Sequence, residues 1–400
     1  MTAAFATIAI ATMIAAARGE PFGVRLAPDG RPEYLMDFAA IRAFTRAAWS
    51  GVLARESTSI YTPAAYQRAT ELWLGRPVDV AQPSGYSPTM LWVMAPFCAL
   101  PGRLAFFAWS IAGILATAWM MLRARVSWPA LLVFLMPLTV FAVALGQTAL
   151  LGVPALFYLM TAEREEQGGW EVAGKLGAVL WLLTAKPPLA IVAGTALLAR
   201  GRWRVLVVAV ALTVVGTVVL TPWLGHAWIG DYITILGSYD RTRMPASSAW
   251  ALAPGLMSNL RATLHVDLGI TDGVATRMSA SCWGIALAGL LVTARRGALS
   301  PGAVWSLSLL SSLIFCPHVT ATEELALFLV PASLAAHGAG GALEGTATAL
   351  VLAGVLLSPA LGPARARRPP PAFFTKALLL VPVILTAKAS DRGRAAADAV

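Results

Sequence analysis

Long apolar runs separated by short polar clusters recur along the whole chain, from Phe5 to the last residues. Several runs reach or approach the roughly 20 residues that a helix needs to cross the hydrocarbon core of a bilayer. Only helices and closed barrels satisfy their backbone hydrogen bonds in lipid, and the alternation of barrel strands is absent. The pattern predicts an all-α polytopic membrane protein of about 11–13 transmembrane helices, with residues 1–400 as a single integral-membrane domain.

Two regions are too polar to span a membrane and are predicted as extracytoplasmic loops, residues 18–88 and residues 225–272. Within the first, residues 36–55 (MDFAAIRAFTRAAWSGVLAR) carry apolar side chains at helical spacing and a polar opposite face. This spacing predicts an amphipathic helix at the membrane interface that ends near Gly51. A second such helix is expected over residues 63–75. The second loop contains aromatic side chains suited to the headgroup belt: Trp228, Tyr232, Tyr239 and Trp250.

The two ends of the chain are interpreted from hydropathy alone. Residues 3–17 predict a first membrane helix, since no Lys or Arg precedes the run; a cleaved signal peptide is the alternative. Residues 390–400 are expected to form a cytoplasmic tail.

A Lys followed by two prolines interrupts the apolar stretch 176–200, in the sequence AKPP. Prolines remove backbone donors and a lysine ammonium must reach water or an anion, so two half-length helices are predicted. One unbroken helix over 176–200 is the alternative. Residues 89–101 are expected to form a short re-entrant or surface helix.

Composition supports a membrane class and argues against nucleic acid as a partner. Charged residues make up 12% of the chain and hydrophobic residues 58%, whereas soluble domains carry about 25% charged residues. The formal net charge is +10, but the cations fall in short clusters between apolar runs, as the positive-inside rule describes. The clusters are Arg123 with Arg125, Arg200 with Arg202 and Arg204, Arg295 with Arg296, residues 365–368, and Arg392 with Arg394.

Placing the basic clusters in the cytoplasm gathers four polar features on the opposite face. With a break at AKPP, that outer face receives residues 18–88, Gln147, Lys186 and the Pro317–His318 pair. An unbroken 176–200 helix would scatter them. The convergence predicts a site on the outer face, at the boundary of the cytoplasmic membrane.

Asp37 and Lys186 are the most informative candidates for that site. A carboxylate beside Tyr34 and Phe38 can act as a general base on an attacking hydroxyl, and the alternative is a helix N-cap or an interfacial carboxylate. Lys186 is a cation within an apolar stretch, and such a cation marks a functional site that needs an anionic partner such as phosphate.

Five further polar residues have a structural as well as a functional interpretation. Tyr86 is a belt aromatic or a ligand-facing phenol, Gln147 caps a turn or binds substrate, and His318 caps a helix end or holds a phosphate oxygen. Arg241 and Arg243 bind an anionic headgroup or are solvated.

Signatures of soluble enzymes are missing from the sequence. There is no Walker loop, dinucleotide fingerprint, zinc-type His or Cys spacing, or acidic pair for a nucleotide-sugar metal. The three cysteines, Cys98, Cys282 and Cys316, lie in or next to apolar runs and are expected to be structural thiols. No metal and no cofactor is therefore predicted.

Five segments in order resemble glycosyltransferase family 87, of the C-type superfamily, over roughly residues 30–240 with a weaker similarity at Pro317 and His318. The segments are MDF, GVLARESTSIYTPAAY, YSPTMLWVMAPFCALP, ALGQTALLGVPAL and TAKPPLAIVAGTALLARGRWR. Ser87 stands where the family usually has proline. The resemblance implies a C-type bundle with interfacial helices in the first outer loop.

The resemblance also implies a function. Members transfer a sugar, often mannose, from a polyprenyl-phosphate donor to a hydroxyl of a lipid or glycan acceptor outside the cytoplasmic membrane, with inversion. By position, Asp37 matches the catalytic base, and Lys186 and His318 match polar residues around the donor phosphate. The expected partners are this donor, a glycolipid or glycan acceptor and membrane lipids.

Two other functions remain open. A lipid or anion transporter, a flippase, would use Lys186 and Asp37 to bind a translocated anion without making a bond. A membrane scaffold that catalyses no reaction would leave the energetic cost of the intramembrane lysine unexplained.

Overall fold

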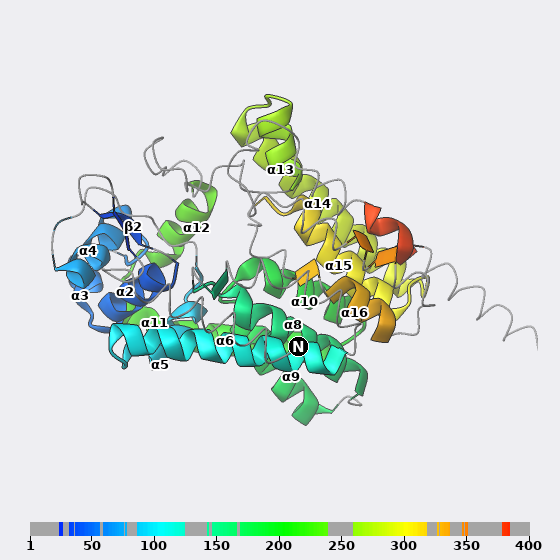
Figure 1. The fold of residues 1–400 in the computed structure, drawn as a ribbon, viewed down its shortest axis with the longest axis horizontal. Coiled ribbons are helices and arrows are strands. Elements are labelled where there is room, and N and C mark those ends of the chain that lie inside the picture. The colour runs from blue at the N-terminus through cyan, green and yellow to red at the C-terminus, as the bar shows by residue number, and fades with distance from the viewer. Residues whose placement is uncertain are drawn as a thin grey trace, which may run out of the picture.

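A computed structural model describes the fold of most of the chain (Figure 1). The described residues are 24–26, 32–35, 37–56, 59–75, 77, 86–124, 142–143, 146–165, 169–238, 259–317, 326–327, 329–336, 346–347, 349–350 and 378–384. The predicted helix over residues 3–17 and the tail 390–400 lie outside these ranges. Among the described residues, three helices are long and apolar enough to cross a membrane: α6 (Gly102–Ala124), α11 (Trp203–Leu224) and α14 (Asp272–Arg295).

The three long helices expose many large apolar side chains, whose contact with water would be energetically unfavourable. On α11 a stripe of valines is between 47% and 64% exposed, namely Val207, Val210, Val214, Val215, Val218 and Val219. Exposed apolar surface of this extent marks contact with lipid or with another chain. Together with the length of the helices, it confirms the predicted all-α membrane class. The predicted total of 11–13 helices stays a prediction.

The AKPP segment separates two helices, as the sequence predicted. Helix α9 (Trp170–Leu183) ends at a turn through Thr184 and Ala185, and Lys186 is the N-cap of α10 (Pro187–Ala199). Pro187 and Pro188 occupy the first helical turn, where the missing backbone donors have no intrahelical partner in any case.

Helices α9 and α11 run parallel, so α10 between them must reverse direction. The rings of Trp170 and Trp203, at the two helix starts, are 6.0 Å apart. Further along, a Cβ atom on Gly177 would come within 2.6 Å of Val208, and one on Gly216 within 3.4 Å of Trp181. The chain therefore passes from one end of the bundle to the other three times between Trp170 and Leu224.

Helices α6 and α8 (Ala149–Glu165) also run parallel. The Trp109 indole donates to the carbonyl of Gly146 at 3.0 Å, just before α8, and the ring of Trp119 lies 5.8 Å from that of Phe157. Both helices consequently start at one end of the bundle. We call this end, with Gly146, Thr184, Lys186 and Leu224, the α2 end; the opposite end, with Glu163, Trp170, Arg200 and Arg202, is the Glu163 end.

The Glu163 end is held by a buried carboxylate between two arginines. The Glu163 side chain has no exposed surface, and its Oε1 lies 3.0 Å from Arg202 Nε and 3.4 Å from Arg200 Nε. Arg202 also donates to the Glu163 carbonyl at 2.7 Å. These contacts join the last turn of α8 to the α10–α11 turn, and they place Glu163 beside the Arg200 cluster.

The first polar region forms a helical lobe on the left of Figure 1. Its helices are α2 (Asp37–Trp49), α3 (Val52–Glu56) and α4 (Pro63–Leu74), and a two-stranded antiparallel hairpin, β1 (Val24–Leu26) and β2 (Pro32–Leu35), precedes them. The lobe contacts the α2 end of the bundle, where the Ile60 amide donates to the carbonyl of Leu224 at 3.0 Å. The hairpin was not predicted.

Helix α2 ends before Gly51 as predicted, but the expected solvated polar face is wrong. Arg42 is 2% exposed and Thr45 is fully buried, while Arg46 is exposed. The reason is that α2 packs on both α4 and α5 (Thr89–Cys98), so side chains on its polar face are covered as well. Arg42 adapts by donating to the carbonyls of Phe97 and Leu100 at the end of α5.

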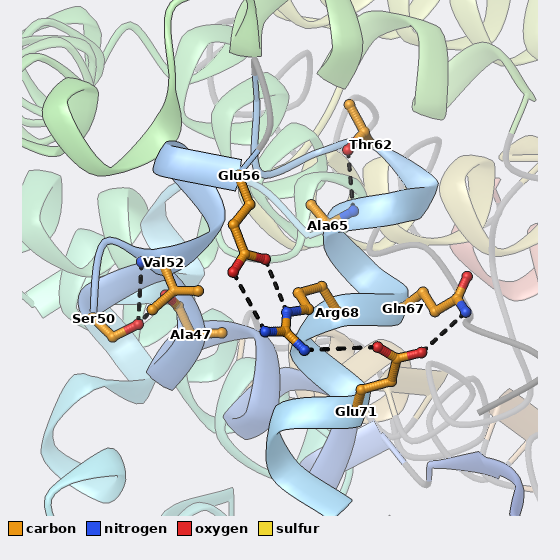
Figure 2. Close-up of polar contacts among 9 residues, drawn as sticks. All are labelled: Ala47, Ser50, Val52, Glu56, Thr62, Ala65, Gln67, Arg68 and Glu71. Carbon is orange, nitrogen blue, oxygen red and sulfur yellow. Dashed lines mark hydrogen bonds and ion pairs between the residues drawn. The ribbon is translucent and has the colours of Figure 1, made fainter. Parts of the chain in front are cut away.

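Helices α3 and α4 are joined by exposed polar contacts (Figure 2). The Thr62 hydroxyl accepts from the Ala65 amide at 3.1 Å and caps α4, whose last turn ends at Gly75 with φ of 67°. Arg68 pairs with Glu56 through two hydrogen bonds of 2.9 and 3.4 Å. The second predicted interfacial helix, over 63–75, is thereby confirmed as a helix.

An aromatic core fills the lobe and extends to α12 (Trp228–Ser238). The ring of Tyr61 lies 4.9 Å from Tyr232 and 5.9 Å from Phe44. Burial raises the pKa of the Tyr232 phenol to about 12, and burial also raises the pKa of the Tyr61 phenol well above its usual value. Tyr232, assigned to the headgroup belt by sequence, thus packs against the lobe.

The second half of the described chain forms a helical group to the right in Figure 1. It contains a short helix α13 (Leu260–Ala262), a π-helical turn η2 (Thr263–Asp267), α14, α15 (Pro301–Phe315) and α16 (Leu329–Ala336). Helices α14 and α15 are antiparallel, since Ser279 near the start of α14 donates to the carbonyl of Phe315. Helix α10 packs on both, and the Ser308 hydroxyl donates to the Val192 carbonyl at 2.8 Å.

The two carboxylate–arginine pairs described above should differ in their contribution to stability. Glu163→Gln should clearly lower the melting temperature in detergent, because two arginines lose their carboxylate partner. The loss in free energy of unfolding should stay below about 3–5 kcal/mol, the value for a fully buried pair, since both arginines are partly exposed. Glu56→Gln, in an exposed pair, should change the melting temperature little. Equal shifts for the two variants would contradict this account of the Glu163 end.

Candidate functional site

The start of α2 lies directly on the turn that contains Gly146 and Gln147. Phe38, the second residue of α2, is 2% exposed, and its ring lies 5.6 Å from that of Phe106 and 6.0 Å from that of Trp109. A Cβ atom on Gly146 would overlap the Cβ of Phe38. The backbone of Asp37, one residue earlier, is therefore brought to the same turn.

The Gly146–Gln147 turn is fixed by its own backbone. Gly146 has φ of 63°, which only glycine adopts readily. Its amide donates to Val143 and the Gln147 amide donates to Ala142, the two hydrogen bonds of a Schellman cap. A turn is present at Gln147, as one of its two sequence interpretations expects, and Gln147 is 7% exposed.

A second turn at the same end, from Thr184 to Lys186, is tied to the start of α5. The Ser87 hydroxyl donates to the Thr184 carbonyl at 2.6 Å. Thr184 Oγ1 donates to the Trp181 carbonyl at 2.6 Å, so the 2.7 Å contact between Thr89 and Thr184 uses the proton of Thr89. Ser87 thus makes a hydrogen bond that a proline at this position could not make.

The two turns lie next to each other because α8 and α10 start side by side. A Cβ atom on Gly152, in the first turn of α8, would come within 2.6 Å of Leu189 Cδ1, in the first turn of α10. Both helices therefore point the positive ends of their dipoles toward the α2 end, although Pro187 and Pro188 at the start of α10 carry no amide hydrogen. An anionic group bound at this end would be stabilised by both.

The Lys186 turn lies deeper in the bundle than the end of α11. Trp181, near the end of α9, packs beside Gly216, which is eight residues before Leu224 at the end of α11. Because α9 continues only two residues beyond Trp181, its end lies six residues short of the end of α11, or about 9 Å along the helix axis at 1.5 Å per residue. Helix α5 packs against α11 at the level of Gly216, since the Trp92 indole donates to the Gly216 carbonyl at 3.2 Å.

Helix α2 is held in place by contacts along its whole length. Arg42 is bonded to the end of α5, and the Trp49 indole donates to the Leu91 carbonyl at 3.3 Å. Burial, followed by the nearby charge of Arg46, lowers the pKa of Arg42 from its usual value. The position of the Asp37 backbone is thus set by a rigid helix and does not depend on a loop.

Three candidates predicted from the sequence lie at the α2 end. Tyr86 is half-buried next to Ser87, Gln147 is buried in its turn, and Lys186 is half-buried as the N-cap of α10; each makes further contacts. Asp37 is the first residue of α2, and its side chain lies outside the described part of the structure. His318, Arg241 and Arg243 also lie outside the described residues.

A polar cluster that sequence reasoning missed lies at the start of α14. Arg261 has no exposed surface and binds Asp272 through both Nε and Nη2, at 3.0 and 2.8 Å to Oδ1. Asn259 caps α13 by accepting from the Ala262 amide at 3.0 Å. The available signal was an Asn two positions before an Arg in the segment SNLRATL, a pattern that no spacing rule singles out.

Metal-binding chemistry finds no support among the described side chains, where no three His, Cys, Asp or Glu residues gather as potential ligands. The described cysteines are free thiols, and that of Cys316 is buried.

The three long apolar helices define an integral membrane protein. Its candidate site lies at the α2 end, at the turns that contain Gln147 and Lys186. The sequence model of glycosyltransferase family 87 matches residues 85–321, more than half of the chain. The chain therefore belongs to this family and is a membrane glycosyltransferase. Comparison with curated proteins and with solved structures gave no match.

The matched range differs from the range expected from the sequence. It extends further toward the C-terminus, through the Arg261 cluster and Pro317, and it begins after α2. Tyr86, Gln147 and Lys186 lie inside it, whereas Asp37 lies outside. The family match thus covers the turns at Gln147 and Lys186 but not α2, and the proposed role of Asp37 depends on the position of α2.

Gly146 should tolerate substitution less well than another glycine with the same backbone conformation. Gly146→Ala introduces both a strained φ and an overlap with Phe38, whereas Gly75→Ala introduces only the strain, because no atom lies within 4 Å of its Cβ position. We expect Gly75→Ala to cost about 1–2 kcal/mol and Gly146→Ala to cost more and to lower transferase activity. Thermal unfolding in detergent and activity measurements compare the two; equal costs would contradict the close contact.

Proposed function

We propose that the chain transfers a sugar, mannose being the expected one, from a polyprenyl-phosphate donor to a hydroxyl of a glycolipid or glycan acceptor. The reaction takes place on the extracytoplasmic side of the cytoplasmic membrane, in which the protein is multi-pass. The observation that carries the proposal is the packing of Phe38 on Gly146, which brings Asp37 to the turn beside Gln147 at the end where Lys186 lies.

In this mechanism Asp37 is the general base. Its carboxylate removes the proton from the acceptor hydroxyl as the hydroxyl oxygen attacks the anomeric carbon of the donor. The bond between that carbon and the phosphate oxygen breaks, and the phosphate leaves with the bonding electrons. Attack opposite the leaving group inverts the configuration at the anomeric carbon.

The departing lipid phosphate gains negative charge, so cations and helix N-termini nearby lower the barrier. Lys186 is the N-cap of α10, and the adjacent start of α8 carries Gln147. We propose that Lys186 and Gln147 bind the phosphate, with His318, Tyr86, Arg241 and Arg243 as further donor or headgroup contacts. The leaving group is already activated, so this scheme includes no metal or cofactor.

A lipid donor fits the location of the candidate site. The turns at Gln147 and Lys186 lie at helix ends next to helices with lipid-facing surfaces, where a polyprenyl chain can remain in the bilayer while its phosphate reaches the turn. The α2–α4 lobe lies over the same end and offers a surface outside the bundle for the acceptor.

Asp37→Asn tests the proposed base directly. The variant keeps the size of the side chain and should retain expression, membrane insertion and melting temperature. Transfer from a radiolabelled polyprenyl-phosphate mannose to membrane acceptors should fall by at least about 10²–10⁴-fold, the usual contribution of general base catalysis.

Arg46→Gln, on the exposed side of the same helix, serves as the control and should transfer like the wild type. Retained transfer by Asp37→Asn would reject Asp37 as the base. Movement of the lipid across proteoliposomes without formation of a glycosidic bond would favour a flippase.

Lys186→Met should raise the KM for the lipid-phosphate donor and lower kcat, because the phosphate loses a cation in both the ground state and the transition state. Lys186→Arg keeps the charge and should retain part of the activity. The KM for the acceptor should stay unchanged in both variants. A change confined to the acceptor KM would place Lys186 in the acceptor site instead.

A further inference from the structure

The hydroxyl of Thr148, directly before α8, is buried and makes no hydrogen bond within the described part of the chain. Thr148 is 7% exposed, and by its position it is the N-cap residue of α8. The hydroxyl of a threonine N-cap normally accepts a hydrogen bond from an amide of the first turn. Here the Leu151 amide donates to the Thr148 carbonyl at 3.1 Å. The hydroxyl therefore does not serve as a helix cap.

The side chain of Thr148 lies on the face of α8 that meets the Lys186 turn. The Gly152 amide donates to the Thr148 carbonyl at 2.9 Å, so the two residues are one α-helical turn apart and share a face. On that face, a Cβ atom on Gly152 would come within 2.6 Å of Leu189 Cδ1. Leu189 lies three residues after Lys186, and α8 and α10 run in the same direction. One turn nearer the α2 end, the face with Thr148 is therefore level with Lys186.

The groups gathered at this level are hydrogen-bond donors or carry positive charge. The start of α8 offers backbone amides, because the first amides of a helix have no partner within the helix. Helix α10 begins with Pro187 and Pro188, which have no amide hydrogen, so it contributes its dipole and the N-cap cation Lys186. The Thr148 hydroxyl adds a donor on the side where α10 lacks one. This set favours an anion with several acceptor oxygens, such as a phosphate.

Folding alone does not account for the Thr148 hydroxyl. A buried hydroxyl without a hydrogen bond costs free energy of folding, and a valine, which has the same shape, would avoid this cost. Ser110 and Thr45 also carry buried hydroxyls without a partner in the described chain, but they lie in the interior of α6 and α2. Thr148 differs because it stands at a helix start, level with a cation, where an oxygen atom of a bound ligand can accept its proton.

We infer that the Thr148 hydroxyl donates a hydrogen bond to an oxygen of a lipid-linked phosphate that binds between the start of α8 and the Lys186 turn. This inference rests on the proposed function, in which that phosphate belongs to the sugar donor. The hydroxyl is neutral and can donate to the phosphate both before and after the sugar has left. Thr148 therefore contributes mainly to the affinity for the donor and for the released lipid phosphate, and less to kcat.

The experiment measures binding without any sugar transfer. Purified full-length protein in detergent is titrated with a polyprenyl phosphate that carries no sugar, and the melting temperature is followed. Polyprenol, which lacks the phosphate, and inorganic phosphate are the comparison ligands. Thr148→Val replaces the hydroxyl by a methyl group and should weaken binding of polyprenyl phosphate at least about tenfold, since a hydrogen bond to a charged group is lost. Thr148→Ser keeps the hydroxyl and should retain most of the affinity.

Two controls separate a ligand contact from a structural role. Without ligand, Thr148→Val should melt at the same temperature as the wild type or higher, because the hydroxyl has no partner in the described fold. Thr161→Val removes a hydroxyl from the same helix near the Glu163 end, where this hydroxyl donates to the Phe157 carbonyl at 3.0 Å. This variant should bind polyprenyl phosphate as the wild type does.

Four results would overturn the inference. The first is unchanged binding of polyprenyl phosphate by Thr148→Val, and the second is equal stabilisation of the wild type by polyprenol. The third is equal stabilisation by inorganic phosphate at the same concentration, which would assign a free phosphate in place of a lipid. The fourth is failure of Thr148→Val to fold, which would show that the hydroxyl is structural.

The outcome is distinguishable from failure of the proposed function. Binding of polyprenyl phosphate that depends on the Thr148 hydroxyl, in a protein that transfers no sugar, would keep the phosphate contact and reject the function. Sugar transfer that Asp37→Asn abolishes, with the same donor KM in Thr148→Val as in the wild type, would keep the function and reject the phosphate contact.

Discussion

The contact between Phe38 and Gly146 is the constraint on which the arrangement of the α2 end depends. Gly146 supplies both a positive φ and the absence of a side chain, so one glycine permits the helix cap and the close approach of α2. A side chain at this position would push α2 away from the bundle, and Asp37 with it. The lobe can therefore pack on the Gly146–Gln147 turn of the bundle because Gly146 has no Cβ atom.

The two ends of the bundle are stabilised by different chemistry. At the Glu163 end a carboxylate joins two arginines. At the α2 end, hydroxyl, indole and carbonyl groups near Lys186 form neutral hydrogen bonds, such as those of Ser87 and Thr89 with Thr184. Neutral hydrogen bonds hold the backbone without adding a fixed charge, which suits an end that would bind an anionic substrate.

The sequence predicted those features that hydropathy and local chemistry determine. The break at Lys186, the turn at Gln147 and the helix over 63–75 follow from proline, glycine and capping residues, which act over a few positions. Burial of Arg42 could not be predicted, because it depends on α5 covering the polar face of α2. The spacing of apolar residues along α2 predicts one buried face, and it contains no information about a second helix that packs on the polar face.

The candidate site shows the same limit of sequence reasoning. Gln147 and Lys186 were found because each breaks an apolar run, and the structure brings their two turns together through Gly152 and Leu189. The Arg261 cluster was missed because the hydrogen bonds of Arg261 to Asp272 and of Asn259 to Cys316 join residues 11 and 57 positions apart along the chain. Their relation exists only after α13, α14 and α15 have packed.

The offset between α9 and α11 has a consequence for the surrounding bilayer. Helix α9 has 14 residues and α11 has 22, so at 1.5 Å per residue they measure about 21 and 33 Å. Only the longer one matches a hydrocarbon core of about 30 Å. Beside the shorter helices the membrane must thin or admit water, and this hydrophobic mismatch would draw a lipid headgroup below its usual level, toward Lys186.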